Sequence, residues 1–301
     1  MELFTKMLRT QISAINKISD VCSNEKSHTV QRAMQDKIGG FMAHEYIDEV
    51  EYKPVECDEI QAEYVIPKKL NYKGVILYLH GGGYVSGDLQ YAKGFGTILS
   101  AQNGIKVCCL AYRLAPENPF PCALDDAVCA YNKLIEDGFA PSEIILCGES
   151  SGGGLIYALA LKLKELNIKL PCGIIAISPW TDLTMSGTSY EDNKDIDPSM
   201  TKKRLECYAH CYSDDTSSPF VSPIMADFTG FPPSMIFVGG DEVMLSDSVG
   251  LHKKLCDAGC SSELHIAPDM WHIYLLYGTK QAKEDITKIS EFIGELLNDK
   301  Q

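Results

Sequence analysis

The sequence has no continuous apolar run of about 18 residues, the length that a membrane-spanning helix requires. Residues 1–20 also lack the basic start and the unbroken apolar stretch of a secretory signal peptide. Basic residues are scarce: 27 Lys and Arg stand against 41 Asp and Glu, which gives a formal net charge of -14. This excess of negative charge argues against nucleic acid or an anionic membrane surface as a partner. We therefore expect a cytoplasmic protein with no membrane or nucleic-acid partner and with a neutral or apolar substrate.

Internal repeats and low-complexity tracts are also missing, and 301 residues with 45% hydrophobic composition suit one large core. Twelve cysteines are present, but examples such as Cys108 and Cys109 lie inside an apolar strand-like run. We interpret the cysteines as reduced, buried residues rather than as a disulfide framework. Cys207, His210 and Cys211 stand close together on an expected helix, yet no second Cys/His pair lies nearby to complete a zinc set. No metal site is predicted.

Short continuous apolar runs alternate with helical patterns along most of the chain, which is typical of a parallel α/β sheet. The expected buried strands are 75–79, 105–111, 143–149, 172–178, 234–240 and 264–267, preceded by edge strands within 41–66. Helices are expected over about 1–20, 122–136, 153–166, 200–212 and 280–297, with a shorter helical piece ending at Gly39 and Gly40. The first of these helices carries one apolar stripe that needs a surface to cover.

Residues 181–222 break this alternation with an acidic linker followed by the helix at 200–212. Inserted helical material over the carboxyl ends of a parallel sheet usually shapes the ligand site, so Met200, Tyr208 and Tyr212 can supply apolar walls. The alternative is a surface excursion that only packs on the core.

The chain is organised around the segment Gly148-Glu149-Ser150-Ser151-Gly152, where an apolar run ends and a helix begins. Such a tight strand-to-helix turn forces Ser150 into a sparsely allowed backbone conformation, and the flanking glycines avoid collisions. The Ser150 hydroxyl then stands beside the N–H groups of the helix start, which suits an anion forming there. Because five-residue patterns also match by chance, an incidental serine or a phosphate-binding turn is the alternative.

A second glycine-rich stretch, His80 to Tyr84, follows the expected strand 75–79. Its three consecutive glycines expose backbone N–H groups that can turn towards an oxyanion, and His80 can brace the loop. Taken alone, a flexible loop is the simpler interpretation. After the next strand, Arg113 and Glu117 are interpreted as structural residues that tie their loop to the scaffold by a charge-assisted pair.

A carboxylate and a histidine follow Ser150 in chain order, each after a strand-like run. Asp241 and Glu242 follow the strand at 234–240, and His272 follows the last strand. Nucleophile, carboxylate and histidine in this order are typical of an α/β-hydrolase triad. The alternative for His272, which adjoins Trp271, is a buried core residue.

Together, His80-Gly81-Gly82-Gly83, the Tyr112-to-Glu117 motif, the segment 148–153 and the terminal His272 make this sequence resemble the hormone-sensitive-lipase-like esterases. These are also called family IV or arylacetamide-deacetylase-like esterases, and they have the α/β-hydrolase fold. The resemblance covers about residue 74 to the end. It implies a mostly parallel eight-stranded sheet flanked by helices, as one domain over 1–301, with a helical cap from about 1–45 and 181–222. It also implies hydrolysis of short-chain carboxylic esters without cofactor or metal.

The resemblance assigns roles to individual residues. Ser150 is the implied nucleophile and His272 the base. The implied oxyanion-hole donors are the N–H groups of Gly82, Gly83 and Ser151, and the residues expected to line the substrate pocket are Tyr84, Trp180, Met200 and Tyr208.

Two departures from the family pattern are present. Glu149 and Ser151 stand where the family has Asp and Ala, and the acid motif begins Asp241-Glu242 rather than with a single aspartate. Successive residues leaving a strand point in opposite directions, so only one carboxylate can face His272. The spacing between positions 242 and 272 matches the acid-to-histidine spacing that the resemblance implies, which favours Glu242; Asp241, which otherwise braces the turn, is the alternative acid.

Rival interpretations remain open on the same fold. A small-molecule receptor is one, although the retention of Ser150 and His272 in position argues against it. An amidase or peptidase using the same triad is another. The predicted partner is a small ester substrate, and a homodimer is compatible with the sequence.

Overall fold

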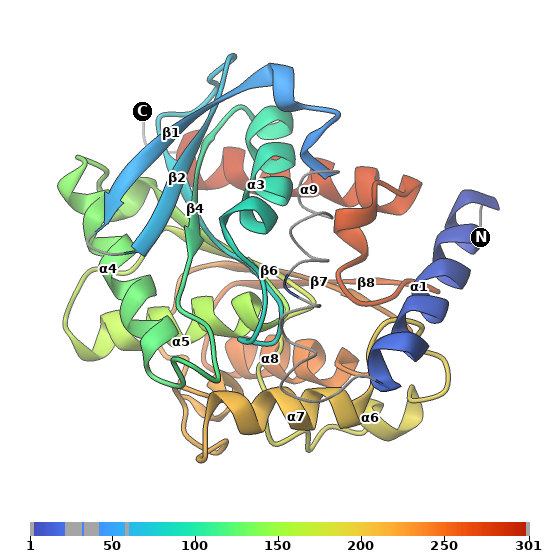
Figure 1. The fold of residues 1–301 in the computed structure, drawn as a ribbon. Helices are drawn as coiled ribbons and strands as arrows, with labels where there is room; N and C mark the ends of the chain where they lie inside the picture. The colour runs from blue at the N-terminus through green and yellow to red at the C-terminus, as the bar shows by residue number, and fades with distance from the viewer. Residues whose placement is uncertain (1–2, 22–31, 33–41, 58–59, 299–301) are drawn as a thin grey trace.

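The computed structural model describes residues 3–21, 32, 42–57 and 60–298, and within them eight strands form a single sheet (Figure 1). The strand order is β1-β2-β4-β3-β5-β6-β7-β8. The β1–β2 and β2–β4 pairs are antiparallel and all other pairs are parallel, so the predicted predominantly parallel eight-stranded sheet is confirmed. The strands are β1 Val50–Cys57, β2 Ile60–Pro67, β3 Val75–Leu79, β4 Lys106–Ala111, β5 Ile144–Glu149, β6 Gly173–Ile177, β7 Ser234–Gly239 and β8 Ser262–Ala267.

Helices cover both faces of this sheet (Figure 1). Helices α3 and α9 pack on one face, and α4, α5 and α8 pack on the other. Along the central strands, successive side chains alternate between these two cores: Ile144 and Leu146 face one, and Ile145 and Cys147 face the other. Strands buried on both sides therefore read as continuous apolar runs. The bounds are α3 Leu89–Asn103, α4 Cys122–Glu136, α5 Ser151–Glu165, α8 Leu245–Asp257 and α9 Lys280–Asn298.

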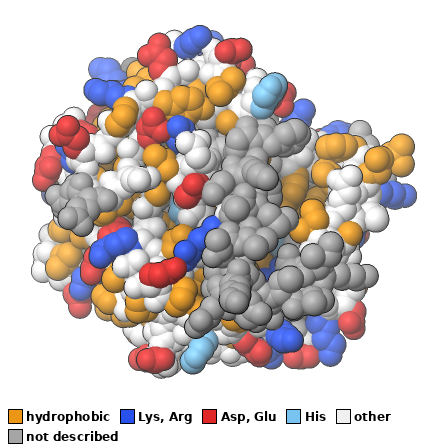
Figure 2. Space-filling model, viewed as in Figure 1, with side chains coloured by type: hydrophobic (Ala, Val, Ile, Leu, Met, Phe, Trp, Pro, Cys, Tyr) orange, Lys and Arg blue, Asp and Glu red, His pale blue; other side chains and the backbone are white. Residues whose placement is uncertain are grey.

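The first helix, α1 Leu3–Val21, forms as predicted, but only part of its apolar stripe is covered. Leu8 and Ile12 pack against the core shared by α3 and α9, whereas Leu3 is 75% exposed and Met7 57% exposed. Figure 2 shows hydrophobic side chains on the surface where α1 lies in Figure 1. The expected helical piece ending at Gly39 and Gly40 lies outside the described residues.

The insertion at 181–222 contains α6 Ser189–Asp192 and α7 Lys202–Tyr212. Its acidic linker is not simply solvated, because the buried Asp197 carboxylate accepts hydrogen bonds from the N–H groups of Ser199, Met200 and Val243. The last of these donors lies in the loop that follows β7. The insertion is thus bonded to the loop that follows β7, so the alternative of a surface excursion that only packs on the core does not describe it.

No helix in the described ranges is both long enough and apolar enough to cross a membrane. The remaining short elements are the 3₁₀ helices η1 Ile47–Glu49, η2 Pro141–Glu143, η3 Pro223–Met225 and η4 Tyr274–Tyr277.

Candidate active site

Ser150 occupies a strained turn between β5 and α5. Its backbone angles are φ 54° and ψ -122°, a left-handed conformation that non-glycine residues rarely adopt. A Cβ atom on Gly148 would lie 2.5 Å from the carbonyl oxygen of Gly152, and one on Gly152 would collide with the backbone of Leu79. Only glycine fits these two positions, so the turn can be this sharp and the Ser150 hydroxyl stands at the carboxyl end of the sheet.

A continuous hydrogen-bond chain joins Ser150 to a histidine and a carboxylate that are distant in the sequence. The Ser150 hydroxyl lies 2.9 Å from Nε2 of His272, and Nδ1 of the same ring lies 2.8 Å from Oε2 of Glu242. All three side chains are buried. Because a carboxylate only accepts, Nδ1 carries the ring proton, and Nε2 presents its lone pair to Ser150.

The second oxygen of Glu242 is also fully engaged. Oε1 accepts hydrogen bonds from the N–H of Gly239 at 2.6 Å and from the hydroxyl of Ser178 at 2.6 Å. Ser178 in turn accepts from the N–H of Ile273, the residue after the histidine, at 2.9 Å. Ser178 therefore holds the acid and the histidine loop together. Sequence reasoning missed this residue, because a serine at the end of a strand belongs to no recognisable motif.

The alternative acid points elsewhere. The Asp241 carboxylate forms an ion pair with Arg9 of α1 at 2.8 Å, and Arg9 also donates to the backbone oxygens of Ile196 and Asp269. Asp241 was expected to brace its own turn if it did not face His272. Its carboxylate instead ties the turn to the first helix, which lies against it.

The His80-to-Tyr84 stretch forms a tight loop next to Ser150. Gly82 has φ 117° and Gly83 has φ 65°, and the carbonyl of Gly82 accepts from the N–H groups of Val85 and Ser86. Among the described residues, none accepts a hydrogen bond from the N–H of Gly82 or Gly83. Ser151 opens α5, so its N–H is one of the four without a partner inside the helix. These donors are available to an anion beside Ser150.

His80 braces this loop. Its Nδ1 lies 2.7 Å from the carbonyl oxygen of Gly81, and its ring stacks on Tyr112 with centroids 4.3 Å apart. The Tyr112 hydroxyl donates to the backbone oxygen of His80 at 2.7 Å. Burial lowers the pKa of His80 to about 4, so the ring is neutral at ordinary pH. A carbonyl oxygen can only accept, so the ring proton lies on Nδ1.

Two of the four residues expected to line the pocket contact the Ser150 turn or the glycine-rich loop, and a third, Tyr84, is part of that loop. The backbone N–H of Trp180 donates to the backbone oxygen of Ser150 at 2.9 Å, and the ring of Tyr208 fills the space where Gly83 lacks a Cβ. Tyr84 stacks on Tyr212 with centroids 3.7 Å apart and planes at 5°.

The fourth predicted wall residue, Met200, follows Ser199, whose hydroxyl accepts from the N–H of His272 at 3.3 Å. The Met200 side chain is partly buried and packs against the core that contains α4, α5 and α8.

Arg113 and Glu117 were expected to pair with each other, but each forms its ion pair with a different residue. Arg113 binds the buried Asp126 of α4 at 2.6 Å, and Glu117 pairs with Arg32 at 2.8 Å. Arg32 also donates to the carbonyl oxygen of Val85, in the glycine-rich loop. Both residues tie their loop down, as predicted, but through residues that their sequence spacing could not identify.

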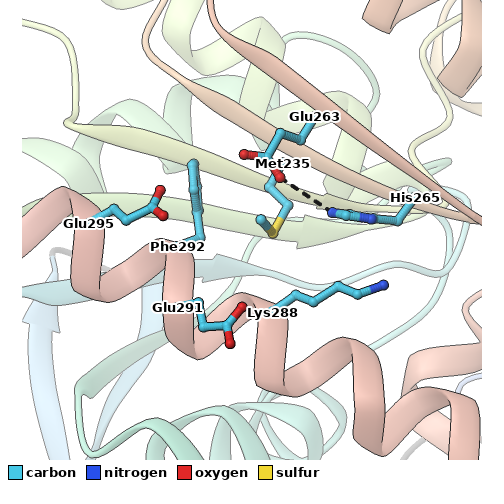
Figure 3. A pocket seen from close by; sticks show the side chains of 7 residues that line it. All are labelled: Met235, Glu263, His265, Lys288, Glu291, Phe292 and Glu295. Atoms are coloured by element: carbon cyan, nitrogen blue, oxygen red, sulfur yellow. Dashed lines mark ion pairs between the residues drawn. The ribbon is translucent and has the colours of Figure 1, made fainter.

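A separate cavity of about 260 Å³ lies between β7, β8 and α9 (Figure 3). Met235, Glu263 and His265 contribute to its walls from the strands, and Lys288, Glu291, Phe292 and Glu295 from the helix. Met235 and Glu263 are the second residues of β7 and β8, whereas Ser150 lies beyond the carboxyl end of β5, and no residue of the Ser150 site lines this cavity. In the parts of the chain that the structure describes, no three His, Cys, Asp or Glu side chains converge on a metal site.

A serine, a histidine and a carboxylate joined in this way at the carboxyl ends of a mostly parallel sheet define a class of protein, the α/β hydrolases. Comparison with known sequences agrees, because a family model described as alpha/beta hydrolase fold matches residues 76–276. The chain belongs to this family.

The sequence is also similar to individual proteins that are named as esterases or acetyl-hydrolases. An acetyl-hydrolase from Streptomyces hygroscopicus is 36% identical over 218 residues, which are 72% of this chain and 73% of the relative. An esterase from Acinetobacter venetianus is 30% identical over 252 residues, which are 82% of this chain and 83% of the relative.

Solved structures give the same result. A variant of esterase E40 matches 98% of this chain and 99% of its own with a TM-score of 0.91 and 30% identity. An esterase of the bacterial hormone-sensitive lipase family matches 96% of this chain and 97% of its own, with a TM-score of 0.88 and 31% identity. The predicted membership of the hormone-sensitive-lipase-like esterases is confirmed, and the chain is an esterase of the carboxylesterase type.

Proposed function

We propose that this esterase hydrolyses short-chain carboxylic esters by two-step acyl transfer, with Ser150 as nucleophile, His272 as base and Glu242 as acid. The observation that carries this proposal is the unbroken hydrogen-bond chain from the Glu242 carboxylate through His272 to the Ser150 hydroxyl. Asp241, bound to Arg9, takes no part in it.

In the first step, His272 Nε2 takes the proton of Ser150 as the hydroxyl oxygen attacks the ester carbonyl carbon. The imidazolium that forms is stabilised by the Glu242 carboxylate, whose other oxygen accepts hydrogen bonds from Gly239 and Ser178. His272 then gives the proton to the departing alcohol, leaving an acyl group on Ser150. Water, deprotonated by His272, releases the acid and restores the serine.

The negative charge of each tetrahedral intermediate requires donors that are in place beforehand. The N–H groups of Gly82, Gly83 and Ser151 are our candidates, because they lie around the buried Ser150 and none of them donates to another group in the described part of the chain. Fixed donors of this kind are each worth about 10²- to 10³-fold in kcat.

The walls of the site favour small acyl groups. Tyr84, Trp180, Tyr208 and Tyr212 are all buried and fill the space around Gly83 and the start of α5 with aromatic rings. The insertion at 181–222, with about residues 1–45, forms the cap in this proposal, and the name of the Streptomyces relative points to acetyl groups. We place the preferred acyl length at about eight carbons or fewer, because these rings crowd the space around Gly83.

A series of p-nitrophenyl esters from two to twelve carbons tests both parts of the proposal. Wild-type kcat/KM is expected to be highest on the short esters, and Ser150→Ala and His272→Ala are each expected to lose about 10⁴- to 10⁶-fold in kcat. A Ser150→Ala preparation, free of contaminating esterase, with activity within tenfold of wild type would overturn the mechanism. A maximum on the twelve-carbon ester would overturn the acyl-length claim alone.

A further inference from the structure

Glu149, the last residue of β5, carries a buried carboxyl group that takes no part in the proton transfers above. Its Oε1 accepts a hydrogen bond from the backbone N–H of Gly81 at 2.5 Å, and its Oε2 accepts from the hydroxyl of Tyr78 at 2.5 Å. Gly81 is the first glycine of the loop that carries the unpaired N–H groups. One side chain, adjacent to Ser150 in the sequence, therefore joins the nucleophile turn to that loop.

The contact between these two segments is close along its whole length. A Cβ atom on Gly81 would lie 3.0 Å from the carbonyl oxygen of Glu149 and 3.0 Å from the Cβ of Ser150, so the loop rests directly on the turn. Further along, the N–H of Tyr84 points to the Ser151 hydroxyl at 3.3 Å. The loop is thus attached to the turn at both of its ends, with Gly82 and Gly83 between the two attachments.

The attachment at Gly81 matters because consecutive glycines hold no conformation by themselves. Glycine occupies a wider range of backbone angles than any other residue. Gly82 and Gly83 both have positive φ, and no side chain of theirs fixes it. Without an acceptor for Gly81, the neighbouring N–H groups can rotate away from the place where an oxyanion forms.

The carboxyl group suits this task in either charge state. Burial raises the pKa of Glu149 to about 7, while hydrogen bonds from Tyr78 and from the N–H of Gly81 act in the opposite direction. Both a carboxylate and a neutral carboxyl retain an oxygen that accepts from Gly81. A glutamine of the same shape retains one as well, whereas an apolar side chain of similar size does not.

We propose that Glu149 is a positioning residue of the oxyanion hole, which holds Gly81 and thereby aims the N–H groups of Gly82 and Gly83 at the reacting carbonyl beside Ser150. This inference rests on the proposed function. The inference goes beyond the proposed function because it gives a role to the acidic residue before the nucleophile. That residue acts through the glycine-rich loop and not through the histidine.

Glu149→Met removes the acceptor at nearly constant volume, Glu149→Gln keeps it, and Tyr78→Phe is the matched control that alters only the other oxygen. On p-nitrophenyl butyrate, Glu149→Met is expected to lose about 10²- to 10³-fold in kcat with KM within threefold of wild type. Glu149→Gln and Tyr78→Phe are each expected to stay within about tenfold of wild type, because both leave Gly81 an acceptor.

Inhibitor binding separates this role from a purely structural one. A trifluoromethyl ketone forms an oxyanion adduct with Ser150, so its affinity is expected to fall in Glu149→Met by the same factor as kcat/KM. An ether analogue of the substrate forms no oxyanion, and its affinity is expected to change less than threefold. Circular dichroism and thermal melting establish that each variant is folded.

Two results would overturn the inference: a folded Glu149→Met enzyme with kcat within threefold of wild type, or equal losses in Glu149→Met and Glu149→Gln. If the methionine variant does not fold, Glu149→Ala replaces it. That variant also removes the acceptor for Gly81 and is expected to lose about 10²- to 10³-fold in kcat; an unchanged kcat there also overturns the inference. If Ser150→Ala remains active, the proposed function itself has failed, which is a different outcome.

Discussion

Replacing Glu242 with glutamine tests the catalytic chain at its buried end, and the surroundings of this side chain determine what the change does. The N–H of Gly239 and the hydroxyl of Ser178 both donate to one oxygen of Glu242. In the variant, the amide oxygen must take that place, which turns the amide NH₂ towards Nδ1 of His272. Two donors cannot face each other, so the imidazole proton moves to Nε2, where the ring can no longer accept the proton of Ser150.

The expected loss follows from this change of tautomer. Glu242→Gln keeps the volume and the fold but is expected to lower kcat by about 10²- to 10⁴-fold, equivalent to about 3 to 5 kcal/mol of transition-state stabilisation. Asp241→Asn is the matched control. Its ion pair with Arg9 has side chains 20% and 24% exposed, and pairs of this kind contribute about 0 to 1 kcal/mol. We expect kcat to fall by tenfold or less in that variant.

Steady-state kinetics on p-nitrophenyl butyrate, with purified variants and a Ser150→Ala background control, measures both effects. KM is expected to change little in Glu242→Gln, because the carboxylate does not touch the substrate in the ground state. The reasoning is refuted if Glu242→Gln keeps kcat within tenfold of wild type, or if Asp241→Asn is the more damaging change.

Three further predictions follow from single contacts. Ser178→Ala removes one donor to Glu242 and the acceptor for the histidine loop, so kcat on the same ester is expected to fall about tenfold with KM unchanged; an unaltered kcat would show that the bond is dispensable. Gly83→Ala sets a Cβ against the Tyr208 ring at a φ of 65°, and a loss of more than about 100-fold in kcat is expected, measured with a thermal melt to confirm folding. Glu149→Gln is expected to change the pH dependence of stability. The folded pKa of about 7 lies above the ordinary 4.5, so the folded wild type holds a proton that the unfolded chain releases, and this stabilisation is lost as pH rises towards 7. Between pH 5 and pH 8, the free energy of unfolding of the glutamine variant should therefore rise by about 2 to 3 kcal/mol relative to that of wild type. The same dependence of melting temperature on pH in both proteins would contradict this.

The sheet was predictable because its signals are local. Continuous apolar runs mark strands buried on both faces, and the final helix carries its buried residues Ile286, Ile289 and Ile293 on one side. The turn at Ser150 is encoded by nearby glycines, and a sparsely allowed conformation was expected there for that reason; the structure shows a φ of 54°.

Two helices had no such signal. Helix α3 is buried over most of its surface and contains Gly94 and Gly96, so it lacks both an apolar stripe and a helix-forming composition. Helix α8 begins at Leu245, shortly after the carboxylates of Asp241 and Glu242, and the helix includes Gly250. In both cases, packing against the sheet decides the conformation, and the local sequence alone does not show it.

The partners of charged residues were the least predictable part of the site, because they depend on which segments the fold brings together. Arg113 binds Asp126, 13 positions away in the chain, whereas Glu117 binds Arg32, 85 positions away. Ser178 stands 64 positions from Glu242 and 95 from Ile273. Sequence spacing gives no measure of such distances until the order of the strands is known.

The insertion and the catalytic loops are mutually dependent in this structure. Asn193 donates to the carbonyl oxygens of Gly240 and Glu242, and the Ser199 hydroxyl accepts from the N–H of His272. Asp197 connects the two contacts, because its carboxylate binds both the N–H of Ser199 and that of Val243, the residue after the acid. Glu242 and His272, the proposed acid and base, thus follow two different strands, β7 and β8, and one short segment of the insertion bonds to the backbone of both loops.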